Sequence, residues 1–151
     1  MSKPGTNKAK KAAAGSIALS KAKARLDEMD KNENNKLVQE FITKFVKCET
    51  VYKTLLRDLN SYNGKVVADK DLKINVNTVE ATLRFAGIGF KHGDVNAVFG
   101  GSGVYENAGT RSCKKLRDAV MHDGNKKAIE EIVNRKDELE PLMDSFLENF
   151  R

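Results

Sequence analysis

The sequence predicts an all-α protein, an antiparallel bundle of four to five helices with a Gly-rich loop before one of them. Apolar residues recur every three and four positions across residues 36–62, and again from residue 128 to the end of the chain. A third amphipathic stretch covers 111–122, and glycines gather just before it, in 87–109. With 151 residues, 40% of them hydrophobic, the chain is long enough for one domain with its own core.

The N-terminal region is strongly basic. All of its charged residues before Asp27 are basic, namely Lys3, Lys8, Lys10, Lys11, Lys21, Lys23 and Arg25. Residues 1–15 are predicted to be a disordered basic arm, followed by a helical domain over 16–151. The arm either keeps the protein in solution or grips phosphates. A loosely amphipathic helix is expected over 16–30, and the polar run at 31–35, KNENN, is expected to end it.

Residues 36–62 carry the strongest helical pattern in the chain. The segment contains no Gly or Pro, and its aromatic and aliphatic residues follow one face. As a helix it would be about 40 Å long, enough to act as the spine of a small bundle. The sequence Tyr62-Asn63-Gly64 then predicts a turn.

The middle of the chain is predicted to hold one short helix and a long loop. Residues 65–76 alternate imperfectly and could be extended or hold a short turn of helix, and Asn77 or Thr78 is then expected to cap a helix that ends near Ala86. Its apolar side would consist of Val79, Leu83, Phe85 and Ala86. Residues 87–109 should form the loop, with Asp94 capping a short turn. Its GGSG run at 100–103 lacks the Gly-Lys-Ser/Thr ending of a phosphate-binding loop.

Residues 111–122 are predicted to form a helix with two different sides. Cys113, Leu116, Ala119 and Val120 share one apolar arc. Arg117 falls on the flank of that arc, where a charge must find a partner because burying it unpaired is costly. Asp118 and His122 are one turn apart and are expected to interact, and Gly124 signals the end of the helix.

The C-terminal segment is predicted to be a long helix that Asn125 caps. Pro141 either kinks this helix or starts a second one. Its last part is acidic, with Glu138, Glu140, Asp144 and Glu148. These carboxylates are natural partners for basic residues elsewhere, including Arg117 of this or a second subunit.

The run Arg117-Asp118-Ala119-Val120-Met121-His122 resembles the signature of the HEPN superfamily, the higher eukaryotes and prokaryotes nucleotide-binding domains. That signature is an Arg, a polar residue, three more residues and a His near the end of a helix. The polar residue is most often Asn in the family, and Asp is also seen. The resemblance covers roughly residues 36–150. It implies an all-α domain, and many family members are metal-independent ribonucleases of toxin–antitoxin or anti-phage systems.

The resemblance also implies roles for the motif residues. Arg117 would orient the scissile phosphate and stabilise its developing charge, and His122 would transfer a proton, with Asp118 orienting the imidazole. HEPN ribonucleases commonly bring two such pairs together in a homodimer, and an antitoxin or other regulatory partner is possible. We also expect four side chains near the motif to contact RNA: Arg111, Lys114, Lys115 and, by stacking on a base, Tyr105. No metal or cofactor is implied.

Two other interpretations remain open for the motif. The domain could be a non-catalytic HEPN-like module that binds RNA, nucleotide or a protein partner, with the Arg and His serving only as an anion site. Alternatively, Arg117 could simply pair with a carboxylate in the core while His122 ends a helix.

Net charge, cysteine count and the length of apolar runs limit the partners and the cellular compartment that are expected for this chain. A net charge of +6 and a pI near 9.3 favour polyanions, RNA first. Cys48 and Cys113 are too few and too far apart for a disulfide framework or a zinc site, so a reduced, cytoplasmic protein is expected. No apolar run approaches the ~20 residues of a membrane span.

Overall fold

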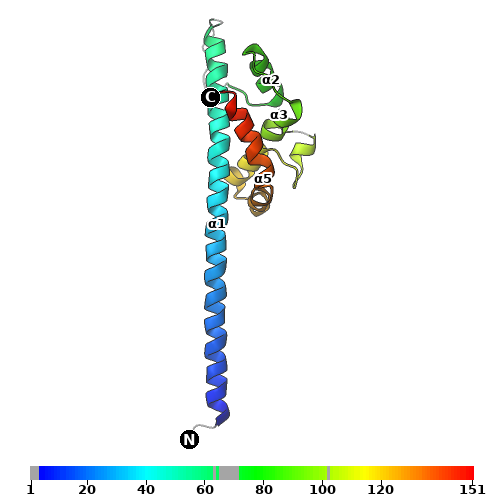
Figure 1. Ribbon diagram of the computed structural model, residues 1–151. Coiled ribbons are helices and arrows are strands. Elements are labelled where there is room, and N and C mark those ends of the chain that lie inside the picture. Colours follow the sequence, from blue (N-terminus) through cyan, green and yellow to red (C-terminus); the bar gives the residue numbers. More distant parts are fainter. Residues whose placement is uncertain (1–3, 63, 65–71, 102) are drawn as a thin grey trace. The chain divides into compact units, whose positions relative to one another are not determined.

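The structure, a computed structural model, describes residues 4–62, 64, 72–101 and 103–151. The regular elements of this part of the chain are all helical, which confirms the predicted all-α class. They are α1 (Pro4–Tyr62), α2 (Val76–Phe85), α3 (His92–Phe99), the short 3-10 helix η2 (Gly103–Glu106), α4 (Cys113–Asp123) and α5 (Lys126–Glu148) (Figure 1).

The predicted disordered arm and the predicted break at 31–35 were wrong, because α1 is one continuous helix, while the predicted helices over 16–30 and 36–62 both lie within it. Residues 4–15 are helical rather than disordered, while 1–3 lie outside the described residues. The KNENN run continues the helix. Asn lowers helix propensity by less than about 0.7 kcal/mol per residue, so polarity alone does not end a helix that lacks a Gly or Pro stop. Pro4 occupies the first helical position, where its missing N–H costs nothing.

The chain divides into two compact units, Met1–Lys36 and Leu37–Arg151. The boundary therefore lies near residue 36 rather than at the predicted residue 16. In the first unit, every residue from 10 to 36 is exposed. The second unit contains the hydrophobic core and is the domain in the physical sense.

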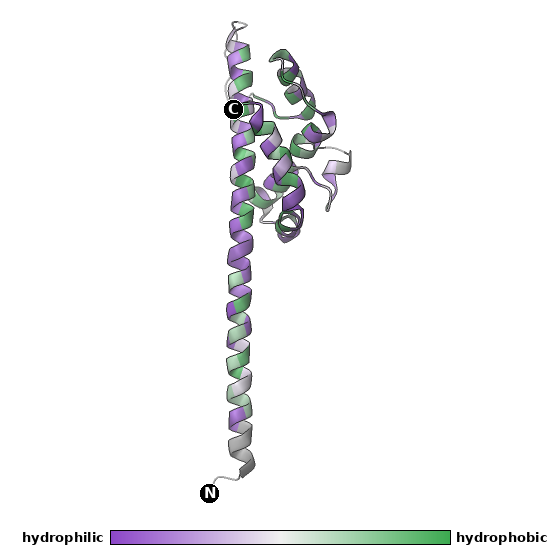
Figure 2. Ribbon diagram, viewed as in Figure 1, coloured by the Kyte–Doolittle hydropathy of each residue, from purple (hydrophilic) through white to green (hydrophobic). Residues whose placement is uncertain are grey.

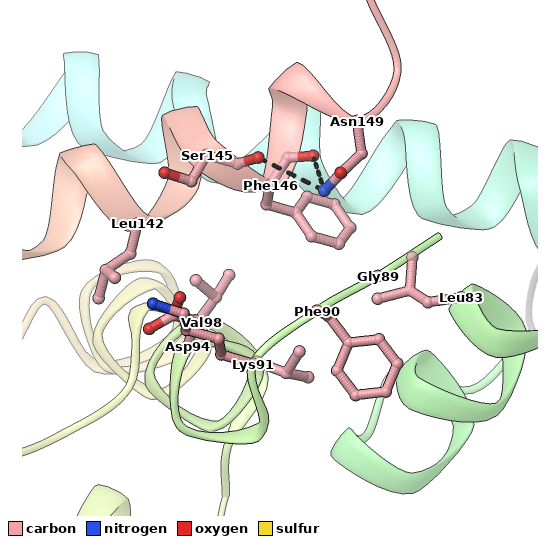
Figure 3. Close-up of a pocket in the computed structure, with 11 residues that line it drawn as sticks. Leu83, Gly89, Phe90, Lys91, Asp94, Val98, Leu142, Ser145, Phe146 and Asn149 are labelled. Carbon is pink, nitrogen blue, oxygen red and sulfur yellow. Dashed lines mark hydrogen bonds between the residues drawn. The ribbon is translucent and has the colours of Figure 1, made fainter. Parts of the chain in front are cut away.

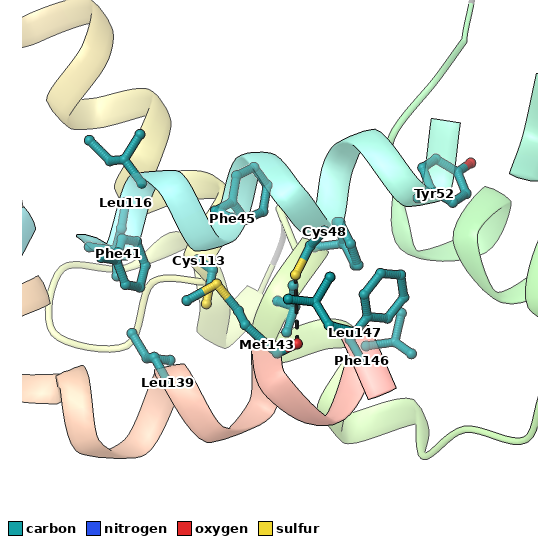
Figure 4. Packing of buried hydrophobic residues seen from close by; sticks show 14 of the residues in the cluster. Phe41, Phe45, Cys48, Tyr52, Cys113, Leu116, Leu139, Met143, Phe146 and Leu147 are labelled. Atoms are coloured by element: carbon teal, nitrogen blue, oxygen red, sulfur yellow. Dashed lines mark hydrogen bonds between the residues drawn. The ribbon is translucent and has the colours of Figure 1, made fainter. Parts of the chain in front are cut away.

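The core of the second unit is built on the apolar stripe of α1, as predicted from the 36–62 pattern. Phe41, Phe45, Cys48 and Tyr52 follow one another on this face, and all four are fully buried. Side chains of α4 and α5 close over them, namely Cys113, Leu116, Leu139, Met143, Phe146 and Leu147 (Figure 4). Each such side chain contributes on the order of 2 kcal/mol on burial.

The ring of Phe99, from α3, joins the elements of this core. Its centroid lies 5.9 Å from that of Phe45, 6.1 Å from that of Tyr52 and 5.1 Å from that of Phe146. These separations are typical of favourable tilted and edge-to-face aromatic pairs. Phe99 thus ties α3 to both α1 and α5.

Helix α2 begins two residues earlier than predicted. Asn75, not Asn77 or Thr78, is the cap, and its side-chain oxygen accepts a hydrogen bond from the backbone N–H of Thr78 at 2.9 Å. Val79 and Leu83 are fully buried as expected. Phe85 is 77% exposed, so its assignment to the apolar side was wrong. Phe85 lies 200° around the helix from Leu83, since each residue turns the chain by about 100°.

The predicted loop 87–109 contains more structure than expected, because α3 and η2 lie inside it. Asp94 lies in the first turn of α3, whose N-cap is Lys91. Gly100 ends α3 under tight packing: a Cβ there would stand 2.3 Å from the carbonyl oxygen of Asn96. The Ser112 hydroxyl donates to the Gly100 carbonyl, which fastens this segment to the start of α4.

Candidate functional site

Helix α4 carries the motif, and its boundaries follow from local chemistry. Ser112 caps the N-terminus by accepting from the Lys115 N–H at 3.2 Å. Gly124 ends the helix in the left-handed conformation, with φ of 55°, and Asn125 then caps α5 by accepting from the Ala128 N–H. The predicted stop and cap are both confirmed. Pro141 lies inside α5, which continues as one helix to Glu148.

The apolar arc of α4 faces the core as predicted. Cys113 and Leu116 are fully buried, and Ala119 and Val120 are partly buried against the same cluster. This orientation leaves Arg117, Asp118 and His122 on the remaining surface of the helix. The position of the motif is therefore set by core packing.

Arg117 is held by two carboxylates and a ring. Its Nη2 lies 3.0 Å from Oε2 of Glu49 on α1, and its Nε lies 2.8 Å from Oδ1 of Asp118. The guanidinium carbon stands 4.8 Å from the centre of the Phe45 ring, within the range of a cation–π contact. The side chain is 19% exposed. The expected partner for a semi-buried arginine exists, but it comes from α1.

The acidic residues of α5 have other partners, which corrects their expected pairing with Arg117. Glu138 contacts Arg135, and Glu148 contacts Arg151. Lys44 of α1 lies 3.0 Å from an oxygen of Asp144 and 3.7 Å from one of Glu140. Burial alone would lower the pKa of Lys44, but these two carboxylates outweigh that effect and raise it. They fasten α5 to α1.

His122 lies in the last turn of α4 and is exposed. Its imidazole makes no hydrogen bond or ion pair with another described residue. The predicted contact with Asp118 is absent, because the Asp118 carboxylate binds Arg117 instead. Five residues on a helix turn the chain by about 140° beyond a full turn, so Arg117 and His122 lie on different faces.

Of the residues expected to contact RNA, some have side chains that bind other groups of the protein, and others have side chains that remain available to a ligand. Arg111 is 12% exposed and binds Glu131 at 3.0 Å, and the Lys114 Nζ donates to the carbonyl of Ile74 at 2.9 Å. The backbone carbonyl of Tyr105 accepts from the Ser112 N–H at 3.2 Å, and the residue is half-buried. Lys115 is half-buried beside Gly101 and has no ion pair among the described residues.

The most elaborate charged cluster surrounds Glu131 of α5. Its carboxylate is 5% exposed and accepts from the backbone N–H groups of Gly109 and Arg111 and from both arginine side chains, Arg111 and Arg135. Burial would raise the pKa of Glu131, but these donors outweigh it and lower that pKa. The cluster anchors the segment before α4 onto α5.

Two groupings were not predicted. Glu49, the Arg117 partner, is one of several charged residues on the polar side of α1, and its spacing gives no sign of this role. His92 is largely exposed, its Nδ1 contacts the buried carboxylate of Glu80, and Asn96 lies 2.7 Å from its Nε2. The pair His92 and Asn96, four apart, becomes recognisable only once α3 is seen to be a helix.

Neither cysteine has the exposed, deprotonated thiol that a reactive cysteine needs. Cys48 and Cys113 are free and buried. Burial raises the pKa of Cys48 to about 12 and also raises that of Cys113, so both remain thiols. Within the described residues, no three His, Cys, Asp or Glu side chains lie together as metal ligands.

A cavity of about 480 Å³ opens between α2, α3 and α5 (Figure 3). Its lining includes the apolar side chains of Leu83, Phe90 and Phe146 and the charged side chains of Lys91 and Asp94. The described residues that line it include none from α4. The cavity and the motif are therefore separate features.

The fold and the motif together define the class of protein only as an all-α domain with an Arg–His helix. No protein-family model, no curated protein and no solved structure matches this chain. No helix in the part of the chain that the structure describes is both long and apolar enough to cross a membrane.

Proposed function

We propose that the protein is a metal-independent endoribonuclease whose active site combines Arg117 and His122 of two chains. The observation that carries this proposal is the exposed imidazole of His122, which has no partner among the described residues, on the same helix as an arginine whose position is set by Glu49 and Asp118. An exposed imidazole can accept or donate a proton, and a fixed guanidinium can bind a phosphate without reorganising.

The chemistry would be transesterification within the RNA chain. His122 takes the proton from a ribose 2′-hydroxyl, whose oxygen attacks the adjacent phosphorus, and the bond to the 5′-oxygen breaks. The His122 imidazolium then gives that proton to the leaving oxygen, so the products are a 2′,3′-cyclic phosphate and a 5′-hydroxyl. The contacts to Asp118 and Glu49 use the Nε–H and one N–H of Nη2 of Arg117, so both N–H groups of Nη1 and the second one of Nη2 are left as donors for phosphate oxygens.

A second copy would complete the site. Arg117 and His122 lie on different faces of α4, so one chain presents them poorly to a single phosphate. Met121, between them, is 63% exposed and offers an apolar contact for another chain. Two α4 helices that meet at a two-fold axis would bring the arginine of one chain toward the histidine of the other.

A non-catalytic RNA-binding or protein-binding module is the second candidate. The neutralisation of Arg117 by two carboxylates favours it, and so do the structural contacts of Arg111 and Lys114. In that case, the net positive charge would give salt-dependent binding without cleavage.

One assay separates the two candidates. The purified protein is incubated with transfer RNA in excess chelator, and the ends of the products are analysed. Ends with a 2′,3′-cyclic phosphate and a 5′-hydroxyl support the nuclease. Salt-sensitive binding to intact RNA would point to the binding module instead.

A further inference from the structure

The first unit exposes apolar side chains at regular spacing. Leu19, Leu26 and Met29 are 56%, 58% and 53% exposed, and Ala22 is exposed between them. The spacings of three, four and three residues place these four residues on one narrow face of α1. Figure 2 shows apolar stretches, in green, among the polar ones along this helix. In a single helix this face would remain in water, at a cost of about 25 cal/mol per Å² of apolar surface.

We infer that this face packs against the same face of a second copy, as a parallel two-stranded coiled coil. Leu19 and Leu26 take the first core position of successive heptads, called a, and Ala22 and Met29 take the second, called d. Leu37 begins the other unit, and the intervening core positions are Glu33 and Lys36. The apolar seam formed by these four residues is therefore two heptads long. Such a short seam should give a weak dimer, whose population rises with protein concentration.

Charge complementarity selects a second copy and a parallel arrangement. Arg25 precedes an a position and Asp30 follows a d position, so they occupy the flanking positions g and e five residues apart. In a parallel dimer these positions face each other, which places each Arg25 beside an Asp30 of the second copy. Arg25 already contacts Glu28 at 3.2 Å, but both side chains are about two-thirds exposed, so exchanging that pair costs little.

Antiparallel arrangements fit the sequence less well. The register that pairs Leu19 with Met29 places Arg25 opposite its own copy, which is repulsive. Moving by one heptad relieves the repulsion but places Leu19 opposite Lys36, and Ala22 opposite Glu33, of the other chain. A shift of one heptad in the other direction keeps the layers apolar, but it places Leu26 opposite Gly15 and Met29 opposite Ala12, and it leaves Arg25 without a carboxylate partner. The parallel arrangement pairs the large apolar side chains with one another and places Arg25 beside Asp30.

A cysteine placed in the seam tests this inference on the full-length chain. In Ala22→Cys, the two thiols would lie side by side at a d layer, whereas in Ala24→Cys they would point outward. Both native cysteines are buried and should not interfere. Under mild oxidation, Ala22→Cys should form an interchain disulfide about tenfold faster than Ala24→Cys. Equal rates would overturn the parallel seam, whatever the state of the α4 contact or of the nuclease.

An exposure-matched pair of lysine variants provides the second measurement. Leu26 and Ile17 are 58% and 57% exposed, but Ile17 lies on the opposite side of the helix from the seam. Leu26→Lys should shift self-association to about tenfold higher concentration in sedimentation, and Ile17→Lys should not. Equal effects of the two substitutions would also overturn the inference.

Discussion

At the scale of single residues, the two arginine clusters next to α4 have opposite compositions. Arg117 is one cation between two carboxylates, Glu49 and Asp118, and is partly open to solvent. Glu131 is one buried carboxylate between two cations, Arg111 and Arg135. The Glu131 cluster anchors the segment before α4 and also lines a cavity of about 480 Å³. The Arg117 side chain keeps 19% of its surface exposed, and the nuclease proposal uses this exposed edge.

Replacing Glu131 with Gln should lower the free energy of unfolding by about 3 kcal/mol at pH 7, because both arginines lose their anion. The pKa of Glu131 is lowered in the folded state, so its contribution is complete above the ordinary carboxyl pKa of about 4.3 and is lost as pH falls through the folded value. Urea unfolding at several pH values measures this effect. The difference between wild type and variant should narrow in acid.

The exposed neighbour Glu130 provides the control, since Glu130→Gln should stay within about 0.5 kcal/mol of wild type. A destabilisation by Glu131→Gln that is equally large at pH 7 and in acid would contradict the proposed ion cluster.

The residue-level predictions succeeded where a local rule decided the outcome. The burial of Cys113 and Leu116 follows from helical period, and the caps at Gly124 and Asn125 follow from backbone chemistry. The partner of Arg117 did not follow, because many carboxylates satisfy the same chemistry and only the packing of α1 against α4 selects Glu49.

At the scale of elements, the turn between α4 and α5 depends on a glycine. Gly124 has φ of 55°, and a side chain there would be strained even though nothing lies within 4 Å of an added Cβ. Gly124→Ala should therefore cost about 1 kcal/mol in thermal or urea unfolding. Gly89→Ala is the matched control, since Gly89 also has open space but not the positive φ. Equal stability of the two variants would mean that the turn relaxes without cost.

The N-terminal part of α1 tests the origin of any affinity for RNA. Lys10 and Lys11 are exposed, and deletion of residues 2–15 removes them together with Lys3 and Lys8. If they contact phosphates, the deletion should weaken RNA binding and make its dependence on salt shallower. Filter binding over a salt series measures both. An unchanged slope would assign this segment to solubility alone.

Element boundaries show what sequence patterns could not decide. The helices over 36–62, 111–122 and the C-terminal segment were predictable because each repeats apolar residues at helical spacing, and these residues pack in the core. Helix α3 was predicted only as a short turn through Val95–Phe99, since its glycine-rich surroundings suggested a loop, although Val95, Val98 and Phe99 are buried. The continuity of α1 was not predicted, because the polar run 31–35 resembles the end of a helix. The exposed N-terminal part of α1 packs against no core, so its sequence shows no strong apolar period.

At the scale of the whole molecule, the nuclease proposal requires that chains associate through α4. Met121→Lys should weaken this association, because Met121 is the exposed apolar residue beside His122. Phe85→Lys, at a 77% exposed residue of α2, is the control. Both should be measured by sedimentation in a Leu26→Lys background, so that the seam of the first unit does not hold the chains together.

In that background, cleavage of RNA should fall with the dimer population of the Met121→Lys protein. A strictly monomeric protein that still cleaves RNA at full rate would contradict the shared site.

The most direct test of the central claim compares the two histidines of the chain in the RNA cleavage assay with chelator. Both are exposed, so His122→Ala and His92→Ala should each leave the circular dichroism spectrum of the folded protein intact. The account predicts that His122→Ala reduces cleavage by about 100-fold or more, the usual contribution of a general acid–base group, while His92→Ala retains the wild-type rate. Full activity in a folded His122→Ala protein would contradict it.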